Sequence, residues 1–380
     1  MKKIMKLSFF MILLISGCAN TSSKETSSPV HTIPIGFIGP LTGDASSYGI
    51  ATKNALELAV QDINTSGGIH GNPVKIIYED GMCNGTGATA AAQKLINVDK
   101  VQYIIGGVCS GETLTAAPLA EQSHTILFSP SSGSPDISTA GDFIFRNFPS
   151  DSSSATKLAS LALKKGYNTF AILSESTDYA QAFSNKFADT FQKSMGTISL
   201  QDSYPSTETD WRSELTKIKN SDANAILVVP QTPVKLLLIL RQMHELGMKL
   251  PLFTSESIAS ETILQQNPSL AEGAYFAEPL FDDTRAQTKL FLKEYKTKYG
   301  NLGELPPIYI ATAYDALFIA KEAMESVGED TKKIKDYLYQ IKNREGAAGV
   351  LTIDQNGDAE FEYVVKQIQN GKGQTVEDVP

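Results

Sequence analysis

Apolar and polar positions follow a repeated strand–loop–helix pattern along most of this chain. The apolar run 33–38 predicts a buried strand, and apolar residues between 55 and 63 recur at the spacing of one helix face, which predicts a helix over 50–64. Strands at 74–78, 101–105 and 125–128 and a helix at 88–98 continue the series. This alternation predicts a parallel sheet with helices on both faces.

A second series of the same kind begins near Pro149. Its predicted elements are helices at 152–165, 180–194, 210–220 and 233–246 and strands at 169–173, 197–203, 225–229 and 252–254. Two helical stretches follow, 284–298 and 307–326, and then two strands, 349–353 and 359–366, joined by a turn at 354–357. A folded part of this length predicts two α/β lobes, because one hydrophobic core does not grow so large.

The first 17 residues have the pattern of an export signal. Lys2, Lys3 and Lys6 precede an apolar run, 7–15, which is shorter than the roughly 20 residues that span a bilayer. Ile15-Ser16-Gly17-Cys18 resembles a bacterial lipobox, so we expect Cys18 to carry lipid and the folded part to lie outside the cytoplasm, in the cell envelope. Residues 18–32, rich in Ser and Thr, are predicted to form a flexible tether. An ordinary secretory signal with a chance cysteine is the alternative.

Composition narrows the classes of function. Of 380 residues 42% are hydrophobic, and removing the three lysines of the acid-free segment 1–17 changes the formal net charge from −9 to −12. An acidic surface argues against nucleic-acid partners. Lipidation of Cys18 leaves Cys83 and Cys109 as a pair, which outside the cytoplasm favours a disulfide. The four histidines lack ligand spacing, so we predict no metal site and no cofactor.

Polar residues gather in the loops after predicted strands, where open α/β sheets bind ligands. These loops are 40–49, 107–113, 129–135, 174–180, 229–233 and 254–258. Serine hydroxyls and helix-start N–H groups suit an anion such as a carboxylate, Glu256 suits an ammonium, and Tyr48 and Tyr179 supply flat walls. Together they predict a site for a small polar or zwitterionic molecule, although singly Ser and Gly also serve as caps and turns.

Several segments resemble type I periplasmic solute-binding proteins, in particular the branched-chain amino-acid-binding components of ABC importers. The resemblance spans about 33–370. The segments that carry it are Leu41-Thr42-Gly43, Tyr48-Gly49, Asp62-Ile63-Asn64, Gly67-Gly68-Ile69, Gly107-Val108-Cys109-Ser110, Ser129-Pro130-Ser131-Ser132 with Pro135, Tyr179, and Ala313-Tyr314-Asp315-Ala316.

The resemblance implies a disulfide between Cys83 and Cys109 and a set of ligand-binding residues. These are Tyr48, Ser110, Ser131, Gly133, Tyr179 and Glu256. Ser110 and the backbone of Ser131 would meet the ligand, the two tyrosines would form walls, and Glu256 would pair with an α-ammonium. Two positions depart from the family. Gly133 stands where a threonine hydroxyl often touches the head group, and Val229-Pro230-Gln231 stands where amino-acid binders place an aromatic.

We therefore expect two Rossmann-like lobes with parallel sheets, joined by three crossovers near 146–150, 276–283 and 346–352. The first lobe would hold 33–147 plus 281–348 and the second 148–280 plus 349–370. A ligand would bridge the lobes, and the closed form would be recognised by a transporter.

The implied function is that of a monomeric, lipid-anchored substrate-binding component of an ABC importer. It would bind an amino acid or amino-acid-like compound and deliver it to the membrane permease. A lipoprotein for an amide or small carboxylate, which serves a sensor, is the alternative.

One motif supports an enzyme instead. Gly107-Val108-Cys109-Ser110-Gly111 matches a nucleophile elbow between a strand and a helix. A cysteine hydrolase would need a free thiol and a histidine base, and neither His124 nor His244 lies in a predicted ligand loop. We predict that the protein is not an enzyme, and a hydrolase using Cys109 remains the remote alternative.

Overall fold

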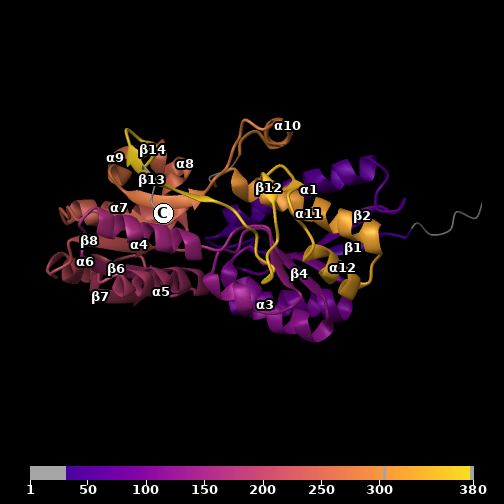
Figure 1. Ribbon diagram of the computed structural model, residues 1–380, viewed down its shortest axis with the longest axis horizontal. Helices are drawn as coiled ribbons and strands as arrows, with labels where there is room; N and C mark the ends of the chain where they lie inside the picture. The colour runs from indigo at the N-terminus through magenta and orange to yellow at the C-terminus, as the bar shows by residue number, and fades with distance from the viewer. Residues whose placement is uncertain (1–30, 303–304, 377–380) are drawn as a thin grey trace, which may run out of the picture. The chain divides into compact units, whose positions relative to one another are not determined.

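The strands of the first predicted lobe form one parallel sheet. The structure, a computed structural model, describes residues 31–302 and 305–376, so the predicted leader, Cys18 and most of the tether lie outside the described residues (Figure 1). The sheet order is β2-β1-β3-β4-β5. Its strands are β1 (Ile33–Gly39), β2 (Val74–Asp80), β3 (Tyr103–Gly106), β4 (Ile126–Ser129) and β5 (Ile144–Arg146). Every neighbouring pair is parallel, so the carboxyl ends of these strands meet at one edge.

Helices cover both faces of this first sheet. Adjacent residues point to opposite faces of a strand, and Ile105 packs under one helix layer while Ile104 packs under the other. The first layer contains α1 (Ser46–Thr65), α11 (Ile308–Val327) and α12 (Thr331–Leu338). The second contains α2 (Gly85–Gln93), the π-helix η1 (Lys94–Val98) and α3 (Ser110–Ser123). Helix α10 (Ala286–Tyr299) packs against α1 and α11.

The second sheet has the order β14-β13-β10-β9-β8-β6-β7. Its strands are β6 (Thr169–Glu175), β7 (Thr197–Tyr204), β8 (Ala225–Val229), β9 (Leu252–Thr254), β10 (Tyr275–Pro279), β13 (Tyr363–Gln369) and β14 (Lys372–Thr375). The pairs among β6–β10 are parallel, but β13 runs antiparallel to both β10 and β14. The sheet is therefore mixed rather than parallel throughout, because the chain re-enters it beside β10 in the opposite direction.

The hairpin at the end of the chain differs from the one we expected. Strands β13 and β14 are joined by Asn370 and Gly371, both with positive φ, which is the favoured geometry for a two-residue hairpin turn. The turn at 354–357 closes only the isolated bridge between Ile353 and Ala359, and β12 (Val350–Leu351) pairs with β11 (Arg344–Glu345).

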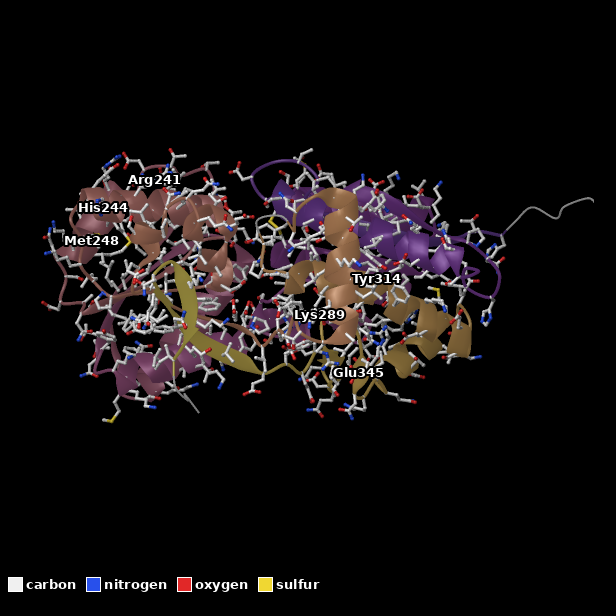
Figure 2. All side chains as sticks on the ribbon, turned by 90° about the horizontal axis from the view of Figure 1, so that it is seen from above. Arg241, His244, Met248, Lys289, Tyr314 and Glu345 are labelled. Carbon is white, nitrogen blue, oxygen red and sulfur yellow. A yellow bond between two sulfur atoms is a disulfide. The ribbon has the colours of Figure 1, made fainter. Side chains whose placement is uncertain are left out.

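Helices also cover both faces of the second sheet. One layer contains α4 (Ser152–Lys164) and α5 (Asp178–Lys193), packed on residues such as Phe170 and Leu227. The other contains α6 (Arg212–Lys219), α7 (Pro233–Glu245), α8 (Glu261–Leu264) and α9 (Pro268–Ala271). Short 3-10 helices lie at η2 (Pro135–Thr139) and η3 (Glu256–Ala259). Figure 2 locates α7 by Arg241 and His244, α10 by Lys289, and α11 by Tyr314.

Three chain segments connect the two sheets and run side by side. Pro149 bridges to Ala359, and the Leu280 N–H donates to the Glu362 carbonyl at 2.7 Å. The Arg146 N–H donates to the Gly357 carbonyl at 2.9 Å, so the chain is still paired with the first sheet at residue 357. We therefore move the third crossover from 346–352 to 359–362, and the first lobe correspondingly extends beyond 348.

Among the described residues, no helix combines the length and the apolar character needed to cross a membrane.

Candidate ligand-binding site

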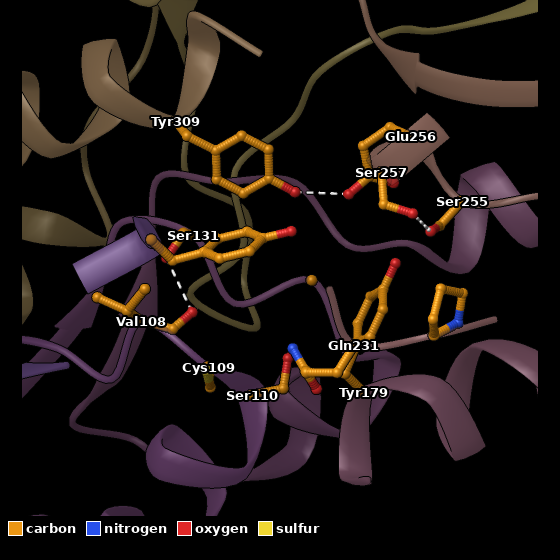
Figure 3. A pocket seen from close by; sticks show the side chains of 13 residues that line it. Val108, Cys109, Ser110, Ser131, Tyr179, Gln231, Ser255, Glu256, Ser257 and Tyr309 are labelled. Atoms are coloured by element: carbon orange, nitrogen blue, oxygen red, sulfur yellow. Dashed lines mark hydrogen bonds between the residues drawn. The ribbon is translucent and has the colours of Figure 1, made fainter. Parts of the chain in front are cut away.

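A pocket lies at the carboxyl ends of strands from both sheets (Figure 3). The empty space among its lining atoms measures about 390 Å³ when the part that opens to solvent is included. Its lining residues are Tyr48, Val108, Cys109, Ser110, Ser131, Gly133, Tyr179, Pro230, Gln231, Ser255, Glu256, Ser257 and Tyr309. All six predicted ligand-binding residues are among them, and each of the six loops chosen from the sequence contributes at least one. The fold thus brings together residues that lie far apart in the chain.

The start of helix α3 forms one end of the pocket. Ser110 is the first residue of the helix, and Cys109 is its N-cap. Glu112, one turn into the helix, accepts the Cys109 N–H at 3.0 Å and the Cys83 N–H at 2.9 Å. The first N–H groups of a helix have no intrahelical acceptor, and the helix dipole is positive there. This end of the pocket therefore suits a carboxylate or a carbonyl oxygen.

The loop after β4 is held next to the start of α3 by a network of hydrogen bonds. Ser131 Oγ donates to the Val108 carbonyl at 2.9 Å, and the Ser134 N–H donates to Ser110 Oγ at 3.1 Å. The fully buried Arg146 donates to the carbonyls of Ser132 and Ser134, at 3.0 and 2.9 Å, and to Asp358. Because these carbonyls are fixed by the guanidinium, the loop is organised before any ligand binds.

Two tyrosines of the first lobe pack together at the pocket. The rings of Tyr48 and Tyr309 meet edge to face with centroids 5.8 Å apart, and Phe148 stacks behind Tyr309 at 4.8 Å. Tyr48 reaches this position because Gly49 allows α1 to approach the preceding loop. A Cβ at Gly49 would lie 1.9 Å from the Pro40 carbonyl oxygen.

Glu256 enters the pocket from the loop after β9. Its side chain is buried, and its Oε1 accepts the Tyr309 hydroxyl at 2.5 Å, while its Oε2 has no hydrogen-bond partner. Burial raises the pKa of Glu256, and the bond from Tyr309 opposes that rise. Figure 3 shows the Tyr309 ring and the Glu256 carboxylate facing each other across this part of the pocket.

The second lobe also supplies Tyr179 and Gln231. The Gln231 N–H donates to Glu175 Oε2 at 2.8 Å, and the other oxygen of Glu175 accepts the buried Lys235 ammonium at 2.7 Å. Lys235 further donates to the Ser206 carbonyl. This buried pair fixes the backbone of Gln231, so its carboxamide extends into the pocket from a rigid base (Figure 3).

A second buried carboxylate stands behind Gly133. The Asp151 N–H donates to the Gly133 carbonyl at 2.8 Å, and Asp151 Oδ1 accepts the Tyr363 hydroxyl at 2.9 Å. A Cβ at position 133 would lie 1.9 Å from Asp151 Oδ2. Burial first, and then the charge of Glu256, raise the pKa of Asp151 well above its ordinary value.

Sequence reasoning missed several of these residues. Tyr309 lies near the start of a predicted helix, where an aromatic in an apolar run is indistinguishable from core, and Asp151 precedes α4 like an ordinary cap. Ser255 and Ser257 stood in a predicted loop without an assigned role, and they bond to each other at 2.8 Å.

Two of the three cysteines pair as the resemblance implied. Cys83 and Cys109 form a disulfide with their Cα atoms 5.4 Å apart, so Cys109 offers no free thiol. His124 packs on Phe143, and His244 lines a separate groove with Met248 at the end of α7 (Figure 2). Within 31–302 and 305–376, no group of three or more His, Cys, Asp or Glu side chains is arranged to hold a metal ion.

A family model described as periplasmic binding protein matches residues 32–373. The chain belongs to the periplasmic binding protein family. Members are solute-binding proteins of transporters, so this periplasmic binding protein is not an enzyme, and the predicted α/β fold class is confirmed apart from the mixed edge of its second sheet.

Relatives of this periplasmic binding protein match it over nearly their whole length. A leucine-, isoleucine-, valine-, threonine- and alanine-binding protein of Pseudomonas aeruginosa is 24% identical, with 94% of both chains covered. A Leu/Ile/Val-binding protein of Escherichia coli is 25% identical, covering 93% of this chain and 95% of the relative. The crystal structure of a leucine-binding protein of Thermotoga maritima has a TM-score of 0.81 at 26% identity, covering 90% of this chain and 97% of that one.

Proposed function

We propose that this chain is the lipid-anchored, extracytoplasmic substrate-binding component of an ABC importer. It binds an amino acid or an amino-acid-like compound in the pocket between its lobes and delivers it to a membrane permease. Cys18 carries the anchor, and Tyr48, Ser110, Ser131, Gly133, Tyr179 and Glu256 contact the ligand, with Tyr309 added from the structure.

One observation carries the ligand class. The pocket joins an end rich in hydrogen-bond donors, at Ser110 and the start of α3, to an end with an unpaired acceptor, at Glu256 Oε2. A molecule with a carboxylate or carbonyl at one end and an amine at the other satisfies both ends. The names of the relatives, which state amino acids as ligands, support the same class.

Calorimetry of the purified protein tests this proposal. L-amino acids, their amides, and carboxylic acids that lack an amine are titrated in turn. We expect binding by ligands that carry both an amine and a carboxylate or carbonyl. Binding restricted to acids without an amine would contradict the proposal.

Two further measurements test the anchor and the transport role. Mass spectrometry of the N-terminal peptide is expected to show lipid on Cys18, and a Cys18→Ser variant is expected to leave the membrane fraction. Deletion of the gene is expected to abolish high-affinity uptake of the bound compound, and unchanged uptake would argue for the sensor role instead.

A further inference from the structure

Three successive backbone carbonyls in the loop after β4 are bound by donors that do not line the pocket. Arg146 Nη1 donates to the carbonyls of Ser132 and Ser134, at 3.0 and 2.9 Å. The Asp151 N–H donates to the carbonyl between them, that of Gly133, at 2.8 Å. Gly133 lines the pocket, whereas Arg146 and Asp151 lie behind the lining. The loop is therefore held by its carbonyls, from the side away from the ligand.

This arrangement decides where the Gly133 N–H points. The Ser132 carbonyl and the Gly133 N–H belong to one trans peptide group, in which the two point in opposite directions. Because the carbonyl points to the buried guanidinium of Arg146, the N–H points away from it, toward the pocket that Gly133 lines. Among the described residues this N–H has no acceptor, so it is available to a ligand.

The charge of Arg146 strengthens this donor. A guanidinium that binds a carbonyl polarises the whole peptide group, since linked hydrogen bonds reinforce one another where water is excluded. Arg146 is 0% exposed, so bulk water does not screen its charge. The described lining of the pocket contains no Lys, Arg or His, and Arg146 supplies positive potential from behind it.

A closed ring of hydrogen bonds sets the orientation of the guanidinium. Arg146 Nε donates to Asp358 Oδ1 at 2.7 Å, and Arg146 Nη2 donates to Ser138 Oγ at 3.1 Å. Ser138 Oγ in turn donates to Asp358 Oδ2 at 2.6 Å. Ser138 lies in η2, which directly follows the loop. Asp358 therefore determines how the guanidinium meets the loop, although it binds a different nitrogen from the one that the loop carbonyls accept.

Asp358 immediately precedes the third crossover, 359–362. Its segment is docked on β5, because the Arg146 N–H donates to the Gly357 carbonyl at 2.9 Å. Gly357 has a φ of +80°, and a Cβ there would lie 2.5 Å from a backbone carbonyl oxygen of β5. Asp151, which binds the Gly133 carbonyl, directly follows the first crossover. The loop is thus bonded to residues beside two of the three segments that connect the lobes.

We propose that Arg146 is a positioning residue for ligand binding, which directs the Gly133 N–H at a ligand carboxylate or carbonyl and ties the loop after β4 to the third crossover. The inference rests on the proposed function, in which Gly133 contacts the ligand. It adds a residue that touches no ligand, and it joins ligand recognition to a segment that connects the lobes.

Hydrogen exchange of the ligand-free protein tests the positioning. Asp358→Asn removes the ionic partner of Arg146, and Ser138→Ala removes one neutral hydroxyl from the same ring. We expect the amides of 131–134 to exchange about 10-fold faster in Asp358→Asn, and by a smaller factor in Ser138→Ala, because the bonds to the loop carbonyls loosen. Melting temperatures verify that each variant folds, and Ser138→Ala decides the question if Asp358→Asn does not fold.

Asp354→Asn is the matched control for the exchange measurement. Asp354 supports the same turn by accepting the N–H groups of Asn356 and Asp358, and it makes no hydrogen bond to Arg146 among the described residues. We expect faster exchange in this control only near 354–358. Unchanged exchange of 131–134 in the folded ring variants, or an equal rise in Asp354→Asn, would overturn the inference.

Calorimetry with L-leucine and L-leucinamide separates positioning from a merely structural role. The two probes differ only in the carboxylate or carboxamide that meets the donor-rich end of the pocket. The double variant Arg146→Gln/Asp358→Asn removes both buried charges and leaves neither unpaired. We expect the preference for leucine over leucinamide to fall by about 10-fold in this variant, because a bond to a charged acceptor loses more than a bond to a neutral one.

The outcomes of this titration separate the inference from the proposed function. Equal weakening of both probes in the double variant would overturn the positioning role of Arg146 and leave the proposed function standing. Failure of the wild-type protein to bind either probe would count against the proposed amino-acid ligand, and the exchange measurement would still decide the role of Arg146.

Discussion

Buried acids in the scaffold and buried acids at the pocket differ in how many of their carboxylate oxygens accept a hydrogen bond. In the scaffold, Glu112 accepts a backbone N–H on each oxygen, and Asp315 likewise accepts the N–H groups of Ala347 and Ala348. At the pocket, Glu256 in the lining and Asp151 behind Gly133 each have one oxygen paired and one unpaired. The scaffold therefore satisfies its own charges, and the pocket leaves acceptors for a molecule that arrives later.

This difference separates stability from binding. A buried carboxylate with two donors is part of the folded state, and removing it leaves two N–H groups unpaired. A buried carboxylate with one unpaired oxygen destabilises the unliganded fold. A ligand that donates to this oxygen removes the destabilisation. Substitution of a scaffold acid is expected to change the stability of the protein. Substitution of a pocket acid is expected to change the affinity for ligand.

The largest expected effect is at Glu256. Glu256→Gln is expected to weaken an amine ligand by about 3–5 kcal/mol, because a buried ammonium loses its ionic partner. In the absence of ligand the variant is expected to be at least as stable as the wild type, because a poorly satisfied carboxylate has been removed. Calorimetry measures the first effect and urea denaturation the second. An equal loss of binding free energy and of unfolding free energy would show that Glu256 stabilises the fold, as the scaffold acids do.

Next in size is the disulfide that positions the donors of Glu112. Replacing both Cys83 and Cys109 by Ser is expected to lower the free energy of unfolding by about 2–4 kcal/mol, since the unfolded chain regains the freedom that the bridge removes. Urea denaturation of the double variant measures this loss. A wild-type sample kept in reductant should show a similar change, and no change in either would contradict a stabilising role for the bridge.

Glu112 is expected to make stability depend on pH. Burial raises the pKa of Glu112 from 4.5 to about 7, so the folded state binds this proton more tightly than the unfolded state. Its contribution is complete below pH 4.5 and is lost as the pH rises to about 7, a change of roughly 3 kcal/mol. The unfolding free energies of the wild type and of Glu112→Gln are measured from pH 4.5 to 7.5. The difference between them should fall by this amount as the pH rises. A difference that stays constant with pH would show that the carboxyl titrates normally.

The smallest expected effect is at Tyr309. Tyr309→Phe removes the hydroxyl that donates to Glu256 Oε1 and keeps the ring that packs on Tyr48 and Phe148. We expect a loss of about 1–2 kcal/mol in ligand affinity, because an acceptor of Glu256 is left unpaired. Calorimetry with the same ligand measures it, and Tyr48→Phe serves as the neighbouring comparison. An unchanged affinity would mean that ligand or water replaces the hydroxyl.

Much of the site was predictable because ligand loops follow strands. The strands at 101–105 and 225–229 are marked by apolar runs, and the polar residues just after them, including Ser110 and Gln231, lie in the pocket as that rule requires. Pairing of Cys83 with Cys109 was predictable from the count of cysteines in an exported chain.

Other features depend on contacts that a linear pattern does not contain. Asp151 and Gly133 are neighbours only because the first crossover passes the loop after β4. No pattern in the sequence links the two positions, so their contact could not be predicted. Strand β5 and helices α8 and α9 are too short to show a period, and they were not predicted. The turn at 354–357 looked like the hairpin turn, whereas Asn370 and Gly371 form it.

Strands β13 and β14 have a consequence for the folding of the second lobe. Strand β13 covers the edge of β10, and β14 in turn lies outside β13, so the second sheet is completed only when the final residues of the fold are available. Until then β10 presents unpaired backbone groups, which favour pairing with other chains. Folding of the second lobe therefore cannot be completed without residues 363–375, and truncations within 363–375 are expected to aggregate rather than to leave a smaller stable protein.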